Sequence, residues 1–444
     1  MQRSLLVVIG ILLATSCFGA THYVVTNGTP GHTGPVNPYT NWATAGTNII
    51  DVVNAAMTNT STRLVWVSNG TYYLTNQVTV SNALTLQSVN GREVTIVDGN
   101  NYAGKPVTNR CFYLFASGAV LDGFTVTNGL VSGDASPSSG GGIYGVAGTV
   151  IKNCRITGCV ATNTAFQKAH GGGVHVAGGV ITNCEVIGNF NYWAFSYGAG
   201  IYVSDGGLAT DCTIASNINE KGFGCGIAAR GGSAVINNCR IYGNTSSDTA
   251  IGGVSLGAGA TVRNSLIYNN RASGGGGVGI VEYTRGNIQN CTIVSNIAYS
   301  YPGGGGIWIN AESTKTSIIE NTICYLNTDS AVATRSNVAF YTSAPYTGSF
   351  HIVNSCIAPT NSFPTNGIEG YYYANNIESN PQFVNKDADD WRLSVKSACV
   401  NKGTNQEWMT NSVDLDNRIR IRYGTVDVGC YETIYEGTIY RLGF

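Results

Sequence analysis

The sequence predicts an all-β protein folded as a parallel β-helix, and the prediction rests on an internal repeat and on the periodicity inside it. One phrase returns throughout residues 140–357: a Gly-rich stretch, a turn ending in Asn, then Cys-x-Ile and a second Asn. The turn position recurs every 26 to 33 residues, at Asn153, Asn183, Asp211, Asn238, Asn264, Asn290, Asn321 and Asn354. A period in this range indicates a solenoid or an array of repeats.

The alternation of apolar and polar residues selects the kind of solenoid. Val174 and Val176 flank His175, and the same pattern surrounds Tyr202 and Trp308. Period two is typical of a strand with one buried face. No stretch inside the repeat has helical spacing, which excludes leucine-rich and helical arrays, and a propeller blade would need four strands. We therefore expect rungs of three short strands that stack about 4.8 Å apart.

Stacking of rungs gives each repeated side chain a structural role. An Asn at a turn tolerates the left-handed conformation, and its amide can bond to the Asn of the next rung. The Cys column follows each turn and comprises Cys154, Cys184, Cys212, Cys239 and Cys291. We interpret these residues as buried thiols that fill a tight corner. Stacked disulfides or a string of metal sites are the alternatives, although in-register Cβ atoms lie farther apart than the roughly 3.8 Å of a disulfide.

These Gly-Gly-x-Ile and Ile-x-x-Asn strands resemble the repeats of bacterial polymorphic outer-membrane proteins, within the larger group of right-handed, pectin-lyase-like β-helices. The resemblance covers most of the chain after residue 20. It implies a right-handed coil, but it is a poor guide to activity, because the group includes lyases, hydrolases, esterases, adhesins and phage fibres.

The beginning of the chain has the pattern of an export signal. Residues 1–20 contain Arg3, an apolar run over residues 5–14, and a small-residue region that ends at Ala20. Cleavage after Ala20 would release the protein, whereas lipidation of Cys17 would tether it to a membrane. Residues 21–60 are expected to form a first strand and a helix over residues 49–57 that caps the open end of the coil.

The β-helix is expected to span residues 61–378, followed by a C-terminal capping segment over residues 379–444. Phrases in the latter resemble a segment of exported β-helix proteins that otherwise carry cell-surface anchors. Cys399 and Cys430 stand apart from the repeat column, in phrases where the resembling proteins commonly have Ala. If the two phrases form neighbouring strands in an exported protein, a Cys399–Cys430 disulfide is expected. The alternative is that both are buried small hydrophobic residues.

One side of the coil is a candidate ligand-binding groove. Inserts of variable length overhang the first strand of each unit, whose outward residues are expected to form a Gly column, from Gly142 to Gly306, and a second column beside it. The groove candidates are Tyr144, His175, Trp193, Tyr202, Arg230, Glu282 and Trp308. Aromatic rings there could stack on sugar faces. Alternatively, the loops pack on the columns and the rings form a hydrophobic lid.

Composition limits the possible functions. The net charge is −1 and charged residues make up 11% of the chain, so nucleic acid is not an expected partner. No apolar stretch long enough to cross a membrane follows residue 20. No catalytic motif with family spacing is evident, no cofactor or metal is expected, and the protein is expected to be a monomer. We expect an exported or cell-surface protein that is adhesin-like, a scaffold or glycan-binding; the alternative is a polysaccharide lyase or glycoside hydrolase acting on a neutral polysaccharide.

Overall fold

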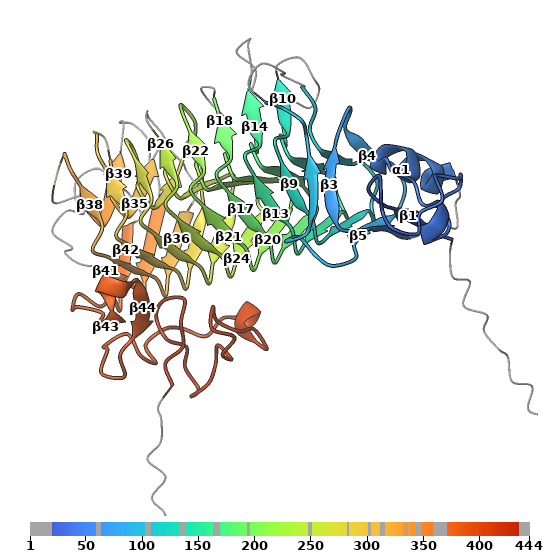
Figure 1. The fold of residues 1–444 in the computed structure, drawn as a ribbon. Helices are drawn as coiled ribbons and strands as arrows, with labels where there is room; N and C mark the ends of the chain where they lie inside the picture. The colour runs from blue at the N-terminus through green and yellow to red at the C-terminus, as the bar shows by residue number, and fades with distance from the viewer. Residues whose placement is uncertain are drawn as a thin grey trace, which may run out of the picture.

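The chain winds as a right-handed coil of short parallel strands, which Figure 1 shows from the N-terminal to the C-terminal end. The expected fold class is therefore confirmed. This computed structural model describes residues 20–58, 64–102, 108–132, 139–162, 169–192, 196–246, 251–281, 284–300, 303–310, 316–331, 333, 336–341, 349–357 and 371–434.

Two long sheets form two sides of the coil. Sheet A has thirteen strands, β1 (Thr21–Val24), β2 (Leu64–Val67), β5 (Thr85–Ser88), β8 (Val120–Asp122), β12 (Val150–Lys152), β16 (Val180–Thr182), β20 (Leu208–Thr210), β24 (Val235–Asn237), β28 (Thr261–Arg263), β32 (Asn287–Gln289), β36 (Thr316–Glu320), β40 (Ser349–Val353) and β42 (Tyr371–Ala374). Sheet B has eleven, β3 (Gly70–Tyr73), β6 (Thr95–Asp98), β9 (Thr125–Thr127), β13 (Arg155–Thr157), β17 (Glu185–Ile187), β21 (Thr213–Ala215), β25 (Arg240–Tyr242), β29 (Leu266–Tyr268), β33 (Thr292–Val294), β37 (Ile323–Tyr325) and β41 (Cys356–Ile357).

Two further sheets close the coil. Sheet C has ten strands, β4 (Val78–Val80), β7 (Phe112–Leu114), β11 (Ile143–Gly145), β15 (Val174–Ala177), β19 (Ile201–Ser204), β23 (Ile227–Arg230), β27 (Val254–Gly257), β31 (Val278–Ile280), β35 (Ile307–Asn310) and β39 (Val338–Tyr341). Sheet D has eight, β10 (Leu130–Ser132), β14 (Val160–Thr162), β18 (Phe190–Asn191), β22 (Ile218–Asn219), β26 (Thr245–Ser246), β30 (Arg271–Ala272), β34 (Ile297–Ala298) and β38 (Thr328–Asp329). Central rungs thus have four strands rather than three, because the two or three residues after each second Asn also pair.

The turn column behaves as the sequence predicts. Every turn residue from Asn153 to Asn354 has a left-handed backbone, with φ between 47° and 56°. Neighbouring amides bond along the column where both partners allow it: Asn183 donates to Asn153 over 2.7 Å, and Asn238 donates to Asp211 over 2.6 Å. The column therefore fixes the turn that leads from sheet A to sheet B.

A second, inner ladder is formed by the second Asn of each repeat. Its buried members are Asn189, Asn217, Asn244, Asn270, Asn296 and Asn327. The Oδ1 atom of Asn244 accepts the backbone N–H and the side-chain amide of Asn217, both over 3.0 Å, and the Asn217 amide also donates to the Val186 carbonyl over 2.9 Å. Each inner Asn thereby pairs backbone groups that the corner between sheets B and D would otherwise leave without partners.

The five Cys residues of the repeat column are buried thiols, as expected. Each thiol donates to the backbone carbonyl two residues earlier; for Cys212 the acceptor is Thr210, at 3.1 Å. They join the buried apolar side chains of all rungs in one continuous core.

The N-terminal end of the coil is covered by helix α1 (Ile49–Thr58), preceded by a 3₁₀ helix at Trp42–Thr44 (Figure 1). The buried face of α1 consists of Ile49, Val52, Val53 and Ala56, as its helical spacing predicts. Strand β1 pairs in parallel with β2, so the sheet already begins at Thr21. In the described part of the chain, no helix has the length and apolarity needed to cross a membrane.

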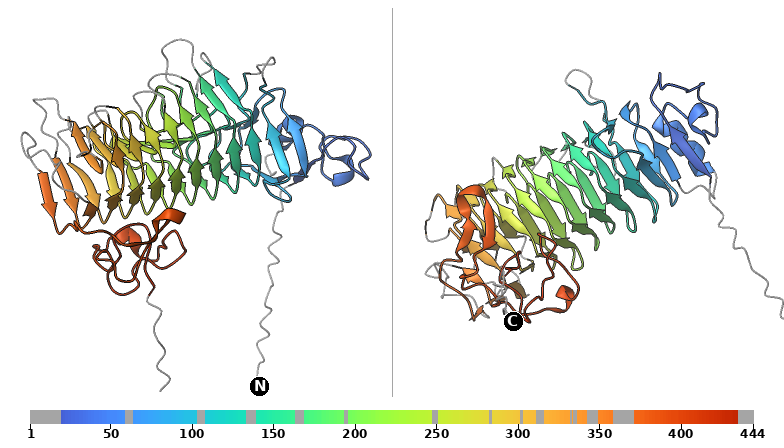
Figure 2. Two further views of the ribbon diagram at one scale, coloured as in Figure 1. Left: turned by 60° about the vertical axis from the view of Figure 1, so that its left-hand side comes forward. Right: turned by 60° about the horizontal axis from the view of Figure 1, so that its bottom comes forward.

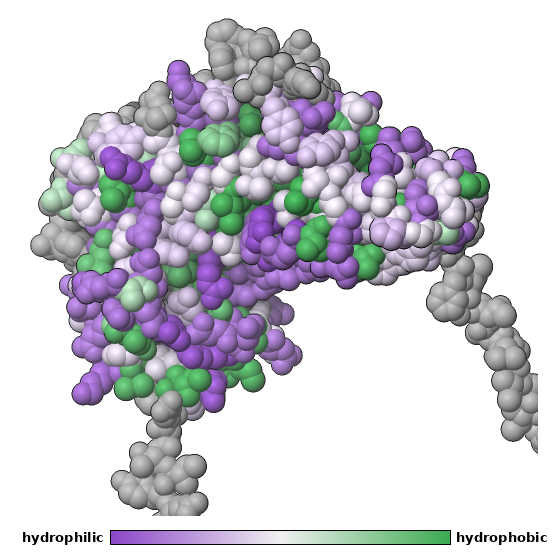
Figure 3. Space-filling model, viewed as in Figure 1, coloured by the Kyte–Doolittle hydropathy of each residue, from purple (hydrophilic) through white to green (hydrophobic). Residues whose placement is uncertain are grey.

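The described C-terminal residues lie along the flank of the coil, beside the later rungs, as both views in Figure 2 show. This segment contains the antiparallel pair β43 (Phe383–Asn385) and β44 (Asp390–Leu393) and the 3₁₀ helices Lys386–Ala388 and Glu407–Met409. It reaches from the Arg240 side chain, which donates to the Leu415 carbonyl over 2.9 Å, to Asn354, which donates to Thr404 over 2.7 Å. On the side drawn in Figure 3, hydrophobic residues are dispersed among hydrophilic ones.

The expected Cys399–Cys430 disulfide is not formed: both residues are free, buried thiols. The two phrases lie side by side, and the Val428 N–H donates to the Cys399 carbonyl over 3.0 Å, but neither phrase forms a strand and the two thiols lie in different apolar clusters. Cys399 packs beside Cys356 and Val428, whereas Cys430 packs among other residues, its backbone N–H donating to the Thr292 hydroxyl over 3.2 Å. The packing alternative describes both residues correctly.

Candidate functional site

A row of outward side chains crosses sheet C in the predicted register. Parallel pairing places Tyr144 beside His175 and His175 beside Tyr202, and it extends the row backwards to Tyr113. Because stacked rungs repeat the same backbone, equivalent positions of successive strands face the same way. The first half of the row, from Tyr113 to Tyr202, is therefore a line of rings along the coil axis.

The rings of this row touch one another at their edges. Ring centroids are 5.4 Å apart for Tyr113 and Tyr144, 4.7 Å for Tyr144 and His175, and 4.6 Å for His175 and Tyr202. The first two pairs are T-shaped, and the third is tilted by 50°. Such contacts stabilise aromatic pairs beyond the burial of area. His175 is buried, while Tyr113, Tyr144 and Tyr202 stay partly exposed.

Cationic side chains border the row at both ends. The Arg110 guanidinium lies 5.2 Å from the Tyr113 ring and 5.4 Å from the Tyr144 ring. At the other end Arg230 lies 4.4 Å from the Tyr197 ring, which itself stacks on Tyr202 at 5.8 Å. Both arrangements have the geometry of cation–π contacts.

A short chain of hydrogen bonds leads away from His175. The Ser204 hydroxyl donates to the Asp205 carboxylate over 2.8 Å, so its oxygen accepts the Nε2 proton of His175 over 3.0 Å. Nδ1 of His175 is buried and has no hydrogen-bond partner among the described residues. Burial lowers the pKa of His175 to about 3, and the nearby His170 and Arg110 add to the shift. His175 is therefore neutral at physiological pH and too weak a base for general acid–base catalysis near pH 7.

Burial also favours the neutral forms of four other ionisable groups in and beside the row. Burial raises the pKa of Tyr144 and of Tyr202, and it lowers the pKa of Arg110 and of Arg230. Desolvation disfavours the charged form in every case. A hydrogen bond made by a ligand at such a surface is stronger than one made in water.

The second half of the row begins with small, buried residues instead of aromatic rings. It consists of Ala228, Ser255 and Gly279, all buried, before Trp308. The Ile251 side chain packs on Gly279, where an added Cβ would lie only 2.4 Å from Ile251 Cδ1. This stretch is thus covered by the protein itself, as the packing alternative states. Trp308, which is half-buried, is separated by it from the aromatic half of the row.

The expected outward Gly column is wrong. A Cβ on Gly173 would lie 2.7 Å from the Gly200 carbonyl oxygen and 3.0 Å from the Asn189 side chain, which belongs to the inner ladder. These glycines therefore face the interior corner. The chain turns between the Gly-rich stretch and the strand, so the period of two does not continue backwards across that turn.

Of the seven candidate residues, the structure brings together Tyr144, His175 and Tyr202, with Arg230 at their border. Trp193 and Glu282 lie outside the described residues. The candidates did not include Arg110, Tyr113 and Tyr197, which the structure adds. Tyr113 could have been found, because Phe112-Tyr113-Leu114 alternates like the later strands; Arg110 and Tyr197 meet the row only through tertiary packing.

The described ranges contain no group of three or more His, Cys, Asp or Glu residues that could hold a metal ion. Asp205 places a carboxylate beside the aromatic half of the row. This carboxylate accepts a hydrogen bond from the Ser204 hydroxyl. The arrangement is suited to non-covalent recognition by rings, hydroxyl groups and guanidinium groups.

Comparison with protein-family models agrees on the fold. A family model described as the right handed beta helix region matches residues 199–388. The solved structures that align with this chain include the pectate lyase Pel9A, at 15% identity over 93% of this chain and 96% of that chain, with a TM-score of 0.49. A PL6 alginate lyase complexed with a trisaccharide aligns at 14% identity over 85% and 92%, with a TM-score of 0.38, and the pectin methylesterase PemA from Erwinia chrysanthemi at 11% over 79% and 92%, with a TM-score of 0.33. No curated protein sequence matches the chain significantly.

Proposed function

We propose that this protein is an exported β-helix that binds a glycan chain outside the cytoplasm, through the aromatic half of the sheet C row. The observation that carries the proposal is the line of Tyr113, Tyr144, His175 and Tyr202 on successive rungs. An extended polymer laid along the coil axis would meet one of these side chains at each rung, about 4.8 Å apart.

The row offers both kinds of contact that sugars need. Partly exposed tyrosine rings can pack against the C–H groups of a sugar, and their hydroxyl groups can exchange hydrogen bonds with it. The guanidinium groups of Arg110 and Arg230 lie at the border, and their positions are fixed by contacts with Tyr113, Tyr144 and Tyr197. Preorganised groups lose little conformational entropy on binding.

Binding without catalysis is supported by the same groups. Most glycosidases use a pair of carboxylates about 5 to 9.5 Å apart. The carboxylate beside the row is that of Asp205, which accepts the Ser204 hydroxyl. The depressed pKa of His175 removes it as an acid or base at neutral pH. An exported location remains part of the proposal and is supported by the pattern of residues 1–20.

The test combines a glycan array with affinity electrophoresis in gels of neutral polysaccharides. The Tyr144→Ala/Tyr202→Ala double variant should weaken binding of the ligand found by about tenfold or more. Tyr144→Phe/Tyr202→Phe retains the rings and should keep most of the affinity. Tyr372→Ala, at an exposed tyrosine of the opposite end, serves as the control.

Two results would contradict the proposal. One is unchanged affinity in the alanine double variant, provided that its thermal unfolding matches that of the parent. The other is the appearance of new reducing ends or unsaturated products when the protein is incubated with the same polysaccharides, which would establish an enzyme.

A further inference from the structure

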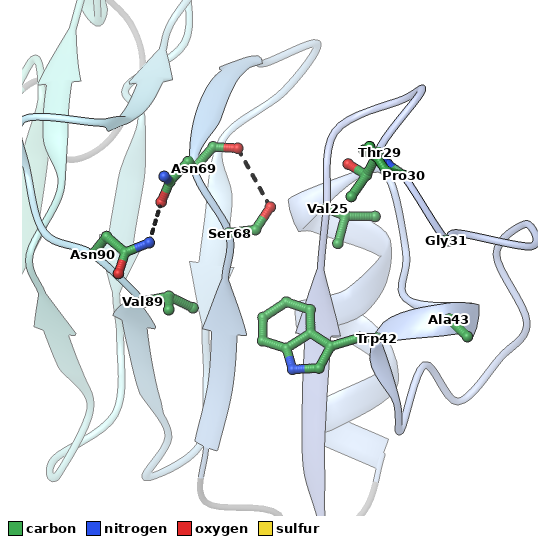
Figure 4. Close-up of a pocket in the computed structure, with 10 residues that line it drawn as sticks. All are labelled: Val25, Thr29, Pro30, Gly31, Trp42, Ala43, Ser68, Asn69, Val89 and Asn90. Carbon is green, nitrogen blue, oxygen red and sulfur yellow. Dashed lines mark hydrogen bonds between the residues drawn. The ribbon is translucent and has the colours of Figure 1, made fainter.

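We propose that the N-terminal end of the coil carries a second ligand site, which holds a single neutral sugar ring. A cavity of about 430 Å³ lies where the chain leaves β1, β2 and β5. Figure 4 shows the side chains that line it. Its lining consists of Val25, Thr29, Pro30, Gly31, Trp42, Ala43, Ser68, Asn69, Val89 and Asn90. None of these residues belongs to the sheet C row, so the site goes beyond the function proposed above.

The cavity has a flat apolar surface made by Trp42. In Figure 4 the indole lies beside Val89 and below Val25. Trp42 is 43% exposed and Val89 is 42% exposed, although both are large hydrophobic residues. The Tyr23 ring supports the indole, with centroids 4.5 Å apart. A supported and exposed indole is a surface on which the C–H face of a sugar ring can stack.

Two amides form the polar edge of the cavity. Asn90 Nδ2 donates to Asn69 Oδ1 over 2.8 Å, and this bond, drawn in Figure 4, fixes the orientation of both side chains. It leaves the Asn69 amide N–H groups and the Asn90 Oδ1 atom without partners among the described residues. One donor and one acceptor therefore stand together at the rim, a pairing that suits the adjacent hydroxyl groups of a sugar.

The wall that carries Trp42 is held in place before any ligand arrives. The Asn41 side chain accepts the Thr44 backbone N–H over 3.0 Å and so caps the short helix that begins at Trp42. Backbone bonds tie the preceding loop to that helix, from Thr33 to the Ala43 carbonyl over 2.8 Å and from Val36 to the Thr44 carbonyl over 3.0 Å. The site resembles the pre-formed pockets that small ligands use.

The chemistry of the lining determines the ligand class. No side chain in it is ionisable at neutral pH, so a charged sugar such as a uronate or an amino sugar would enter without a counter-ion. A purely apolar ligand would leave the Asn69 and Asn90 amide groups desolvated and unpaired. A neutral sugar ring satisfies both the indole and the amides.

The experiment measures binding of neutral disaccharides to the full chain by calorimetry and by ligand-observed NMR. Maltose, cellobiose and mannobiose serve as probes, with a diuronate and glucosamine as charged comparisons. At least one neutral disaccharide should bind with a Kd of roughly 1 mM or tighter, and the charged sugars should bind at least about tenfold more weakly. Trp42→Ala should weaken binding at least about tenfold, and Asn90→Ala about fivefold.

Controls separate this site from the sheet C row. Tyr144→Ala/Tyr202→Ala should leave disaccharide binding unchanged, and Trp42→Ala should leave polysaccharide binding unchanged. Trp42→Phe, which keeps a ring, should retain part of the affinity and shows that the wall still folds. No binding of any neutral disaccharide at roughly 10 mM, undiminished binding by Trp42→Ala, or preference for a charged sugar would overturn the proposal.

Discussion

The two halves of the turn column have the same backbone but different surroundings. Asn183 and Asn321 both adopt the left-handed conformation, with φ of 50° and 51°. Asn183 is exposed, whereas Asn264, Asn290 and Asn321 are buried by the C-terminal segment. Asn321 exchanges two hydrogen bonds with the backbone of Thr404, which lies 83 residues further along the chain.

The difference shows that the repeat determines the conformation of the turn but does not determine whether the turn residue is buried. The turn conformation is local, so it recurs wherever the phrase recurs. Burial depends on a distant segment that docks on the later rungs alone. The same Asn is therefore a turn residue in one half of the coil and also a docking residue in the other, which the following variants are designed to separate.

The largest effect is expected at Arg420, whose buried guanidinium links the segment to the coil. It donates to Asn264 Oδ1 over 3.1 Å and to the Gly429 carbonyl over 3.0 Å, and it lies 3.2 Å from the Glu432 carboxylate. Arg420→Met removes one partner of a buried pair and should lower the free energy of unfolding by about 3–5 kcal/mol. Chemical denaturation of variant and parent measures this change.

The partner residue provides the control for Arg420. Burial raises the pKa of Glu432 to about 8, and the Arg420 guanidinium opposes that shift. The double variant Arg420→Met/Glu432→Gln removes the buried guanidinium together with the acidic group that faces it, and it should recover a large part of the lost stability. A single variant as stable as the parent would show that the pair does not hold the segment.

Asn321→Gly and Asn183→Gly compare the two halves directly. Glycine accepts a positive φ at no steric cost, so these changes remove the side chain without straining the turn. We expect a loss of about 1–3 kcal/mol at buried Asn321, because its two hydrogen bonds to the Thr404 backbone are lost, and less than about 0.5 kcal/mol at exposed Asn183. Equal losses in thermal or chemical unfolding would contradict the distinction between the halves.

Asn238 stands at the boundary between the two halves. Its amide donates to Asp211 over 2.6 Å, and its Oδ1 accepts from Asn264 over 3.2 Å. Asn238→Leu removes both bonds and places a branched side chain at a φ of 51°, so we expect a loss of about 1–2 kcal/mol. An unchanged melting midpoint would show that amide bonding along the column contributes nothing to stability.

The smallest effect concerns the cysteines of the docked segment. Cys399 and Cys430 pack in different apolar clusters, so peptide mapping without reduction should recover them in separate peptides. If Cys399 forms a bond to any thiol, Cys356 is the neighbour that it touches. A linked Cys399–Cys430 peptide would mean that the segment docks differently from this arrangement.

Much of the fold could be predicted because the repeat is local. The left-handed turns, the inward thiols and the buried face of α1 each follow from residues within one rung or one helix. The sequence does not predict the fourth strand of the central rungs, because segments of two or three residues cannot show a period. The docked position of the C-terminal segment also could not be foreseen, because it depends on contacts such as Arg420 with Asn264, which are separated by 156 residues.

The candidate site could be predicted only in part, for the same reason. The sequence predicts the row from Tyr144 to Tyr202, because these residues occupy equivalent positions in successive repeats and the strands pair in that register. Its limits are set by tertiary packing: Ile251 covers Gly279, and Arg110 and Tyr197 approach from outside the strands. The Trp42 cavity lies in a stretch without repeats, where the sequence offers no column to follow.

The docked C-terminal segment also has a mechanical consequence. A stack in which each rung contacts only its neighbours would unwind from its end under a stretching force, one rung after another. Here the chain returns along its own coil and is hydrogen-bonded to rungs from Arg240 to Asn354. A stretching force applied to the segment is therefore shared by the bonds to these rungs, which act in parallel. The last part of the coil should therefore yield in one large step at high force rather than in a series of small ones.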